Sequence, residues 1–336
     1  MIIPIFIMNK GCPNRCVFCN LQKTAGDHPG QITEGQLRQT VASYIGSAKK
    51  KPDDIQLAFY GGNFTGLDGE EEIALLGYAK SLISEGLIHS IRVSTRPDYI
   101  DREQCDLLWS FGVTTVEIGA QSMVDEVLEL SGRGHTSADT VRAVEMLRGW
   151  GFITGIHLMA GLPGDSRERF ACTIDRSIGL KPAMVRLHPT IVFENTALAE
   201  AYGEGRYQPM SLAEAIDACK YALKKFSEAG IPVIRVGLQT TKEMEAAGSI
   251  VAGPFHPAFH ALVEESIFYD MAFDLLSAQD VASKDVVLFV SPRYESYLRG
   301  QKNNNLKRLK ERFRLNAITV KPDEALKWGT RIVNIR

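Results

Sequence analysis

The chain carries three cysteines within one short stretch, Gly11-Cys12-Pro13-Asn14-Arg15-Cys16-Val17-Phe18-Cys19-Asn20. Their spacing is Cys-x3-Cys-x2-Cys, and the stretch closely follows the apolar run of residues 2–8. An apolar run of this length is consistent with a strand. A loop at the end of such a strand can wrap its three thiols around one inorganic centre.

The number of thiols limits which inorganic centre the loop can hold. Structural zinc sites close with four ligands, and ordinary electron-transfer clusters also take four thiolates. The other cysteines, Cys105, Cys172 and Cys219, each stand alone in an apolar, helix-like stretch. With three thiolates, a [4Fe–4S] cluster keeps one iron open for an outside ligand. A redox disulfide, a zinc loop lacking its fourth ligand and a chance grouping are the alternatives.

Composition sets the broad class of the protein. The 336 residues suffice for one large domain, or one domain with a small appendage, and the net charge is −2. The cysteine pattern is unlike a secreted disulfide framework, and the start of the chain lacks the features of a signal peptide. No run is long enough to span a membrane. These features predict a soluble, cytoplasmic protein without a membrane partner.

Short apolar runs alternate with segments of helical period, which is typical of βα units and a parallel sheet. The predicted strands cover six ranges: Ile2–Met8, Ile55–Tyr60, Ile88–Thr95, Val113–Gly119, Phe152–Met159 and Ala183–His188. Six strands, each followed by a helix, suggest an open (β/α)6 partial TIM barrel. A doubly wound sheet would show the same alternation, so periodicity leaves both folds open.

Motifs at the predicted strand ends, together with the cysteine spacing, resemble the radical S-adenosylmethionine (SAM) enzymes and decide for the partial barrel. The set is most similar to the radical core of the Elongator catalytic-subunit family, and partly similar to oxygen-independent coproporphyrinogen oxidase. The resemblance covers roughly residues 1–240. Its motifs are Thr95-Arg96-Pro97-Asp98, Glu117-x-Gly119-x-Gln121-Ser122, Arg133-Gly134-His135-Thr136 and His157-x-Met159-x-x-Leu162-Pro163-Gly164.

The resemblance implies a [4Fe–4S] cluster on Cys12, Cys16 and Cys19, with the open iron chelating SAM. An electron passed through the cluster would cleave SAM to a 5′-deoxyadenosyl radical, which abstracts hydrogen from a substrate. The electron would come from a partner such as a flavodoxin or a ferredoxin. No residue is assigned to handle substrate protons or radicals.

The resemblance also implies a set of SAM contacts, placed residue by residue. Gly61 and Gly62 would approach the SAM amino group with their backbone, Phe18 would lie against the adenine, and Arg133 would pair with the carboxylate. Arg133 could instead be an exposed arginine at a helix start, and His157 could be a core residue. The remaining predicted SAM contacts are Asn63, Ser94, Gln121 and His157.

Two departures from the Elongator pattern limit which properties of that family can be expected of this chain. That family spaces its cluster cysteines more widely, and it carries an acetyltransferase domain with an acetyl-CoA loop that does not occur here after residue 240. We therefore expect a radical SAM core at residues 1–240 without the acetyltransferase half. Residues 241–336 are predicted to form a small C-terminal α/β extension.

A basic run in the extension suggests that nucleic acid could be a binding partner. Seven cations lie in Arg299–Arg314 against Glu311 alone, and Leu306, Leu309 and Phe313 at helical spacing would bury the opposite face. The run is either a solvated helix face or a site for tRNA or other RNA. Three alternative functions stay open. The protein could be an iron–sulfur electron carrier or sensor that does not turn over SAM, or an RNA-binding module without catalysis. It could also be a radical SAM enzyme that acts on a tetrapyrrole or a small metabolite.

Overall fold

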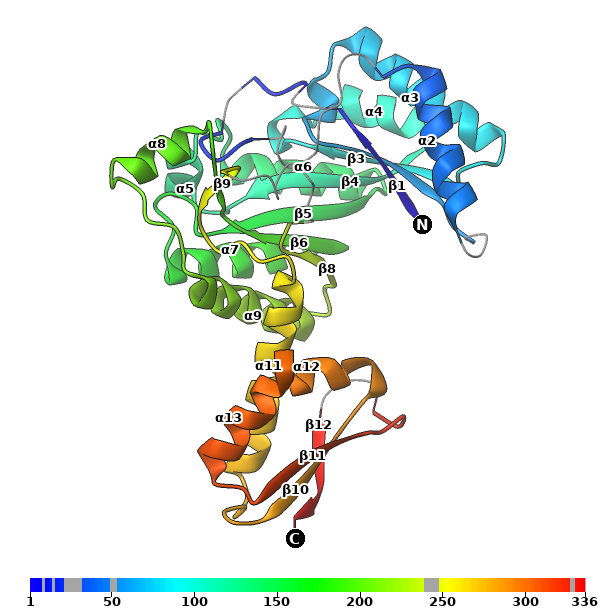
Figure 1. Ribbon diagram of the computed structural model, residues 1–336. Helices are drawn as coiled ribbons and strands as arrows, with labels where there is room; N and C mark the ends of the chain where they lie inside the picture. Colours follow the sequence, from blue (N-terminus) through cyan, green and yellow to red (C-terminus); the bar gives the residue numbers. More distant parts are fainter. Residues whose placement is uncertain are drawn as a thin grey trace. The chain divides into compact units, whose positions relative to one another are not determined.

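The computed structural model describes residues 1–7, 10–13, 16–20, 32–48, 53–238, 248–326 and 330–335, the last range by its backbone alone. The chain forms two compact units (Figure 1). Unit 1 comprises Met1–Ser211 and Ala222–Phe255, and unit 2 comprises Leu212–Tyr221 and His256–Arg336. The predicted domain boundary at residues 240 and 241 lies outside the described residues.

Unit 1 is built on a seven-stranded parallel sheet, as far as its residues are described, with strand order β1-β2-β3-β4-β5-β6-β8. The curled parallel sheet confirms the partial-barrel prediction, and β8 extends it beyond the six predicted strands. The strands are β1 (Ile2–Phe6), β2 (Gln56–Tyr60), β3 (Ser90–Thr95), β4 (Val113–Gln121), β5 (Ile153–Ala160), β6 (Met184–Pro189) and β8 (Val233–Val236).

Helices follow the strands, as the alternating pattern predicts. Their starts are set by local capping. The Thr33 and Thr136 side chains, for example, accept from the backbone amides of Gln36 and Asp139, whose side chains accept from the threonine amides in return, which completes a capping box. The helices of unit 1 are α2 (Glu34–Ser47), α3 (Gly69–Ser84), α4 (Arg102–Ser110), α5 (Asp125–Leu130), α6 (Ser137–Gly149), α7 (Arg167–Gly179) and α8 (Ala197–Gly203), with the short η1 (Phe64–Gly66) and η2 (Pro97–Tyr99). The next helix, α9 (Leu212–Glu228), is divided between the two units.

Residues of the strands alternate between two faces with different chemistry. The outer face is apolar and fully buried, as at Leu57, Phe59, Val116 and Leu187, and helices such as α4 and α6 pack against its strands. The intervening residues form the inner face, where polar and charged side chains gather. The core therefore lies between the sheet and the helices, while the inner face is left for a site.

A two-stranded antiparallel sheet, β7 (Val192–Phe193) with β9 (Ile250–Ala252), completes the described part of unit 1. Buried Ile191 and Phe193 pack there against Leu238, Ile250 and Phe255.

Unit 2 is a small α/β unit, as predicted for the extension. In its three-stranded sheet, β10 (Asp285–Val290) pairs in parallel with β11 (Ala317–Pro322) and antiparallel with β12 (Thr330–Ile335). Its helices α11 (Phe259–Ser277), α12 (Glu295–Arg299) and α13 (Asn304–Phe313), with η3 (Pro292–Tyr294) and η4 (Gln301–Asn303), cover an apolar core centred on Phe268 and Leu288.

Candidate functional site

The predicted site residues come together at the carboxyl-terminal edge of the unit 1 sheet. The cysteine loop follows β1, Gly61, Gly62 and Asn63 follow β2, and Gln121 ends β4. Arg133 lies in the short connection between α5 and α6. In a parallel barrel this edge is where the loops that carry function meet.

The cysteine loop is anchored from both sides by backbone hydrogen bonds. The Val17 amide donates to the Ser131 carbonyl at 3.1 Å, and the Val17 carbonyl accepts from the Leu198 amide at 2.9 Å. The Asn20 side chain donates to the Glu194 carbonyl at 2.8 Å. The described half of the loop is therefore fixed to the α5–α6 connection and to the start of α8.

Close packing between glycines fixes the start of the cysteine loop. Gly11 has a φ of +73°, and a Cβ there would lie 2.1 Å from the Asn63 carbonyl oxygen. A Cβ on Gly62 would lie 2.8 Å from the Lys10 carbonyl oxygen, and one on Gly66 would lie 2.4 Å from that of Gly11. The loops after β1 and β2 thus touch through their backbones, and the predicted contact of Gly61 and Gly62 with SAM stays a prediction.

Asn63 links the two loops with its side chain, which is fully buried. Its Nδ2 donates to the Gly11 carbonyl at 2.7 Å, and its Oδ1 accepts from the Thr95 hydroxyl at 2.7 Å and from the Arg96 amide at 3.0 Å. The structure gives Asn63 this linking role, and its predicted contact with SAM stays a prediction.

Arg133 connects the cysteine loop with the end of β4. Its Nη1 lies 3.1 Å from Cys16 Sγ, and its Nη2 donates to the Gly119 carbonyl at 2.6 Å. The side chain is buried, and its Nε has no hydrogen-bond partner in the described structure. The alternative of an exposed helix-start arginine is therefore wrong.

Gln121 lies beside Arg133 in an uncommon backbone conformation. Its φ is +65°, which non-glycine residues rarely adopt, and its Oε1 is buried without a partner among the described residues. A Cβ on Gly119 would lie 3.3 Å from Gln121 Nε2 and 3.5 Å from Arg133 Nη2. The absence of a side chain at Gly119 leaves room for these two polar groups.

The other predicted contacts are distributed over the same face. Phe18 and Ser94 are half-buried. His157 is also half-buried, and its ring centroid lies 4.4 Å from that of His188. Burial, followed by the neighbouring His188, holds the pKa of His157 well below its usual value. Whether these three residues contact SAM stays a prediction.

The three cysteines share one loop, but their thiols are not gathered around one point. Cys12 and Cys19 are exposed and Cys16 is half-buried. Within the described ranges, no group of three or more His, Cys, Asp or Glu side chains is arranged to hold a metal ion. Partial desolvation of the sulfur and then the neighbouring Cys16 raise the pKa of the Cys12 thiol, although the residue as a whole is exposed, while Arg96 and Arg133 act in the opposite direction.

Arg96 is a part of the site that sequence reasoning missed as an individual residue. It is 3% exposed, and it forms two hydrogen bonds to Asp98 at 2.9 and 2.8 Å. Its Nη1 is buried with no partner in the described structure, and it interacts electrostatically with Cys12 and Cys16. Its position directly after the third strand was the available signal.

These surroundings fit a thiolate-bound iron–sulfur cluster with a carboxylate-bearing ligand. Two buried guanidinium groups, Arg96 and Arg133, face the cysteine loop, and cations favour thiolates over thiols. Among the residues that the structure describes, Arg96 Nη1, Arg133 Nε and the Gln121 oxygen are buried polar atoms without a partner, and a ligand would satisfy them; such atoms are rare in folded proteins.

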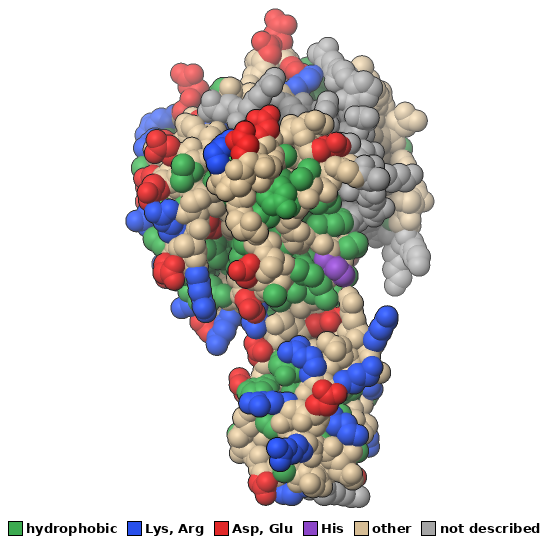
Figure 2. Space-filling view, turned by 60° about the vertical axis from the view of Figure 1, so that its left-hand side comes forward, with side chains coloured by type: hydrophobic (Ala, Val, Ile, Leu, Met, Phe, Trp, Pro, Cys, Tyr) green, Lys and Arg blue, Asp and Glu red, His purple; other side chains and the backbone are tan. Residues whose placement is uncertain are grey.

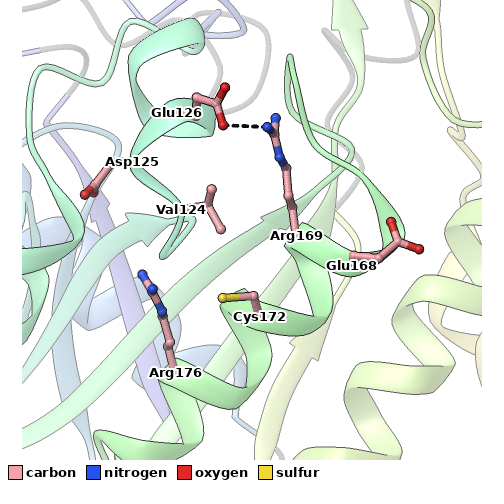
Figure 3. Close-up of a pocket in the computed structure, with 7 residues that line it drawn as sticks. All are labelled: Val124, Asp125, Glu126, Glu168, Arg169, Cys172 and Arg176. Atoms are coloured by element: carbon pink, nitrogen blue, oxygen red, sulfur yellow. Dashed lines mark hydrogen bonds and ion pairs between the residues drawn. The ribbon is translucent and has the colours of Figure 1, made fainter.

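A concave feature of unit 1 lies between α5 and α7 and has a volume of about 500 Å³ (Figure 3). Its charged groups are already engaged: Arg169 pairs with Glu126 at 2.5 Å, and Arg176 donates to the Met123 carbonyl at 2.7 Å. None of the predicted site residues lines it.

Comparison with known proteins agrees with this geometry. The family model of the Radical SAM superfamily matches residues 6–176, which is half of the chain. The chain belongs to the radical SAM superfamily. The model of the radical SAM C-terminal domain matches residues 182–268. Membership in the radical SAM superfamily implies SAM and a [4Fe–4S] cluster as cofactors.

Several curated relatives of this radical SAM protein come from the Elongator group. The tRNA uridine(34) acetyltransferase of Methanocaldococcus jannaschii is 29% identical over 262 residues, which are 66% of this chain and 48% of that protein. Elongator complex protein 3 of Mus musculus is 28% identical over 49% of this chain and 34% of its own length. The chain thus spans about half the length, or less, of these relatives.

A solved structure shares the fold of this radical SAM protein. Elp3 of Methanocaldococcus infernus with an N-terminal deletion aligns with a TM-score of 0.60 at 23% identity, over 79% of this chain and 62% of that one. Coproporphyrinogen III oxidase of Escherichia coli aligns less closely, with a TM-score of 0.48 at 21% identity, over 68% of this chain and 52% of that one. None of the described helices is long and apolar enough to cross a membrane.

Proposed function

We propose that this chain is a radical SAM enzyme whose Cys12, Cys16 and Cys19 hold a [4Fe–4S] cluster. The observation that carries the proposal is the position of Arg133, which contacts Cys16 and the end of β4 at the same time. When bound, the cluster supplies the electron that cleaves SAM reductively and so prepares hydrogen abstraction from the substrate. A one-electron donor such as a flavodoxin or a ferredoxin would be the partner.

The residues of the chain would bind and orient SAM. Gly61 and Gly62 carry no side chain, so their backbone would meet the SAM amino group, and the Gln121 oxygen can accept a hydrogen bond. The Arg133 guanidinium can bind the SAM carboxylate in a bidentate manner, with two parallel hydrogen bonds. A simple electron carrier or sensor needs no such set of ligand contacts, which favours SAM turnover over that alternative.

Anaerobic reconstitution tests the cluster. Wild-type protein should hold about four irons and four sulfides, and Cys16→Ala should lose most of them. Cys172→Ala is the matched control, because Cys172 is a half-buried free thiol on α7, away from the loop. Stoichiometric zinc without iron–sulfur absorption in the reconstituted wild type would refute the cluster.

SAM turnover separates an enzyme from an electron carrier. Given a reductant, the reconstituted protein should release methionine and 5′-deoxyadenosine. Arg133→Ala should weaken SAM binding by about 1.5–3 kcal/mol, the value of a hydrogen bond to a charged group. A protein with a full cluster that releases neither product would be a carrier or a sensor.

RNA, and tRNA in particular, is the substrate class that the relatives and unit 2 support. In unit 2, α13 buries Leu306 and Leu309 and leaves its cations exposed, and Figure 2 shows Lys and Arg side chains over this unit. Arg308 lies 4.1 Å from the Tyr269 ring centroid, while Arg299 is paired with Glu295. Such a face can bind phosphates.

Charge substitution on α13 tests this partner. Replacing Lys307, Arg308 and Arg312 with Gln should reduce tRNA affinity. The slope of the logarithm of the binding constant against the logarithm of the salt concentration should become less steep by up to about three. SAM cleavage without RNA should not change.

The matched control removes three exposed cations from unit 1, namely Arg102, Arg142 and Lys224. This variant has the same net charge and should bind tRNA like the wild type. Equal losses in the two triple variants would show nonspecific attraction, and wild-type protein that binds tRNA no better than a neutral protein would exclude RNA.

A further inference from the structure

Arg96 is a buried cation of the site to which the proposed function gives no role. Its conformation follows from the motif Thr95-Arg96-Pro97-Asp98. Because the residue before a proline favours an extended backbone, Arg96 leaves β3 with φ −82° and ψ 150°. Asp98, two residues on, accepts hydrogen bonds from Arg96 Nε at 2.9 Å and from Arg96 Nη2 at 2.8 Å. The motif therefore binds one edge of the guanidinium to a carboxylate.

The opposite side of the Arg96 guanidinium has an unused donor. In this planar group, a carboxylate bound by Nε and Nη2 leaves Nη1 directed away from it. Arg96 Nη1 is buried, and nothing among the described residues accepts a hydrogen bond from it. The side chain is only 4% exposed, so solvent reaches little of it. A buried charged donor without an acceptor costs free energy, which a bound group would recover.

Arg96 is tied to the start of the cysteine loop. The Asn63 side chain joins the two, because its Oδ1 accepts from the Arg96 amide at 3.0 Å and its Nδ2 donates to the Gly11 carbonyl at 2.7 Å, directly before Cys12. Arg96 also interacts electrostatically with both Cys12 and Cys16. Its guanidinium is therefore close enough to the loop to act on a group that the thiols bind.

The neighbouring side chains do not take over this position. Burial, followed by the charges of Arg133 and Arg96, lowers the pKa of His135 to about 4, so its imidazole is neutral at pH 7. Arg133 is held between Cys16 Sγ and the Gly119 carbonyl, and it is the proposed partner of the SAM carboxylate. Arg96 is thus a second cation beside the cysteine loop, and SAM binding does not require it.

We infer that Arg96 stabilises the reduced form of the cluster and so raises its reduction potential, through its positive charge and a hydrogen bond from Nη1 to a cluster sulfur. On reduction, one electron passes from the donor protein to the cluster, which gains one negative charge. Net charge and hydrogen bonds to the sulfurs both tune the potential of such a cluster, and a buried cation is poorly screened by water. This inference rests on the proposed function, because it requires the cluster on the three cysteines.

The reduction potential of the reconstituted protein, without SAM, tests this role. The cluster is titrated anaerobically with dithionite in the presence of redox dyes, and the reduced fraction is followed by electron paramagnetic resonance. In Arg96→Gln, the ratio of reduced to oxidised cluster at a given potential should fall about tenfold, which corresponds to a midpoint about 59 mV more negative. Asp98→Asn removes the negative charge that compensates Arg96, so its midpoint should become more positive than that of the wild type.

Opposite shifts separate an electrostatic role from damage to the fold. A loosened site would expose the cluster to water in both variants and would move both midpoints in the same direction. Arg96→Lys keeps the charge, so its midpoint should lie closer to that of the wild type than the midpoint of Arg96→Gln does. Arg102→Gln removes an exposed cation on α4 and is the matched control, which should keep the wild-type midpoint.

Two results would overturn the inference and leave the proposed function intact. One is an equal midpoint in the wild type and Arg96→Gln, which together with weaker SAM binding would make Arg96 a SAM ligand. The other is a shift of the same sign in Arg96→Gln and Asp98→Asn. If Arg96→Gln retains no iron, Asp98→Asn decides alone, and an unchanged or more negative midpoint counts against the inference. Wild-type protein that assembles no cluster would instead refute the proposed function, and the inference with it.

Discussion

Replacing Asn63 with alanine tests how the cysteine loop is held to the sheet. The Asn63 side chain makes three hydrogen bonds and is fully buried. After the substitution, the Gly11 carbonyl and the Arg96 amide lose their partner. The Thr95 hydroxyl keeps its hydrogen bond to Thr65. The perturbation therefore leaves two backbone groups unsatisfied, the amide of buried Arg96 and the carbonyl of half-buried Gly11.

The expected cost follows from those two groups. A buried polar group without a partner costs about 1–3 kcal/mol, so the free energy of unfolding should fall by about 3 kcal/mol. The lost bond to Gly11 also frees the start of the cysteine loop, because Gly11 immediately precedes Cys12. The reconstituted variant should therefore retain less iron than the wild type.

Urea denaturation and iron analysis measure the two effects on the same preparations. The matched control is Asn305→Ala in unit 2, since Asn305 is also buried and donates to the carbonyls of Glu265 and Tyr297 at 2.9 and 3.1 Å. It should lose comparable stability but keep its iron. An Asn63→Ala protein with wild-type stability, or one with the iron content of the control, would refute this account of the loop.

Three further predictions follow from the site. Gly11→Ala should lower the free energy of unfolding in urea denaturation by more than about 3 kcal/mol, because its Cβ would overlap the Asn63 carbonyl. Gly86 has a similar φ and open space around it, so Gly86→Ala should cost only about 1–2 kcal/mol. Equal losses in the two variants would contradict the overlap. His188 stays neutral when folded but gains a proton when unfolded below pH 6.5, so the free energy of unfolding should fall by about 1.4 kcal/mol per pH unit as pH drops from about 6.5 toward 3. Urea denaturation of His188→Gln should show a shallower pH dependence, and an unchanged slope would refute it. Arg133→Lys should fold but bind SAM more weakly in calorimetry, since an ammonium cannot reach Cys16 and the β4 carbonyl together; wild-type affinity would remove Arg133 from the SAM site.

Much of the unit 1 fold could be predicted from the sequence because its strands are short apolar runs between helical segments. The predicted strand ends differ from the observed ones by a few residues. The run at residues 113–121 is longer than predicted, since β4 continues through a register shift to Gln121. A positive φ at a glutamine has no signature in composition or period, so this ending could not be foreseen.

Parts of the site could be predicted where a residue type at a given spacing has few functions. They could not be predicted where the role of a residue depends on which side chain it contacts in the folded protein. Three cysteines at this spacing, and a glycine pair at a strand end, each serve only a few purposes in a protein. Arg96 and Arg186 resemble ordinary charged residues in the sequence, because their positions depend on which strands become neighbours. Glu117 is another such residue, and its ion pairs with Arg92 and Arg186 follow from the strand order rather than from the sequence.

The anchors of the cysteine loop have a consequence for how the protein is made. Asn20 binds the backbone of Glu194, 174 residues further along the chain, and Val17 binds Leu198. At about 5–20 residues per second of synthesis, those anchors leave the ribosome roughly 9–35 s after the cysteines. During that interval the nascent thiols lack part of the framework that holds the finished loop. Cluster insertion should therefore follow the completion of unit 1, and a truncated chain ending before α8 should capture iron poorly.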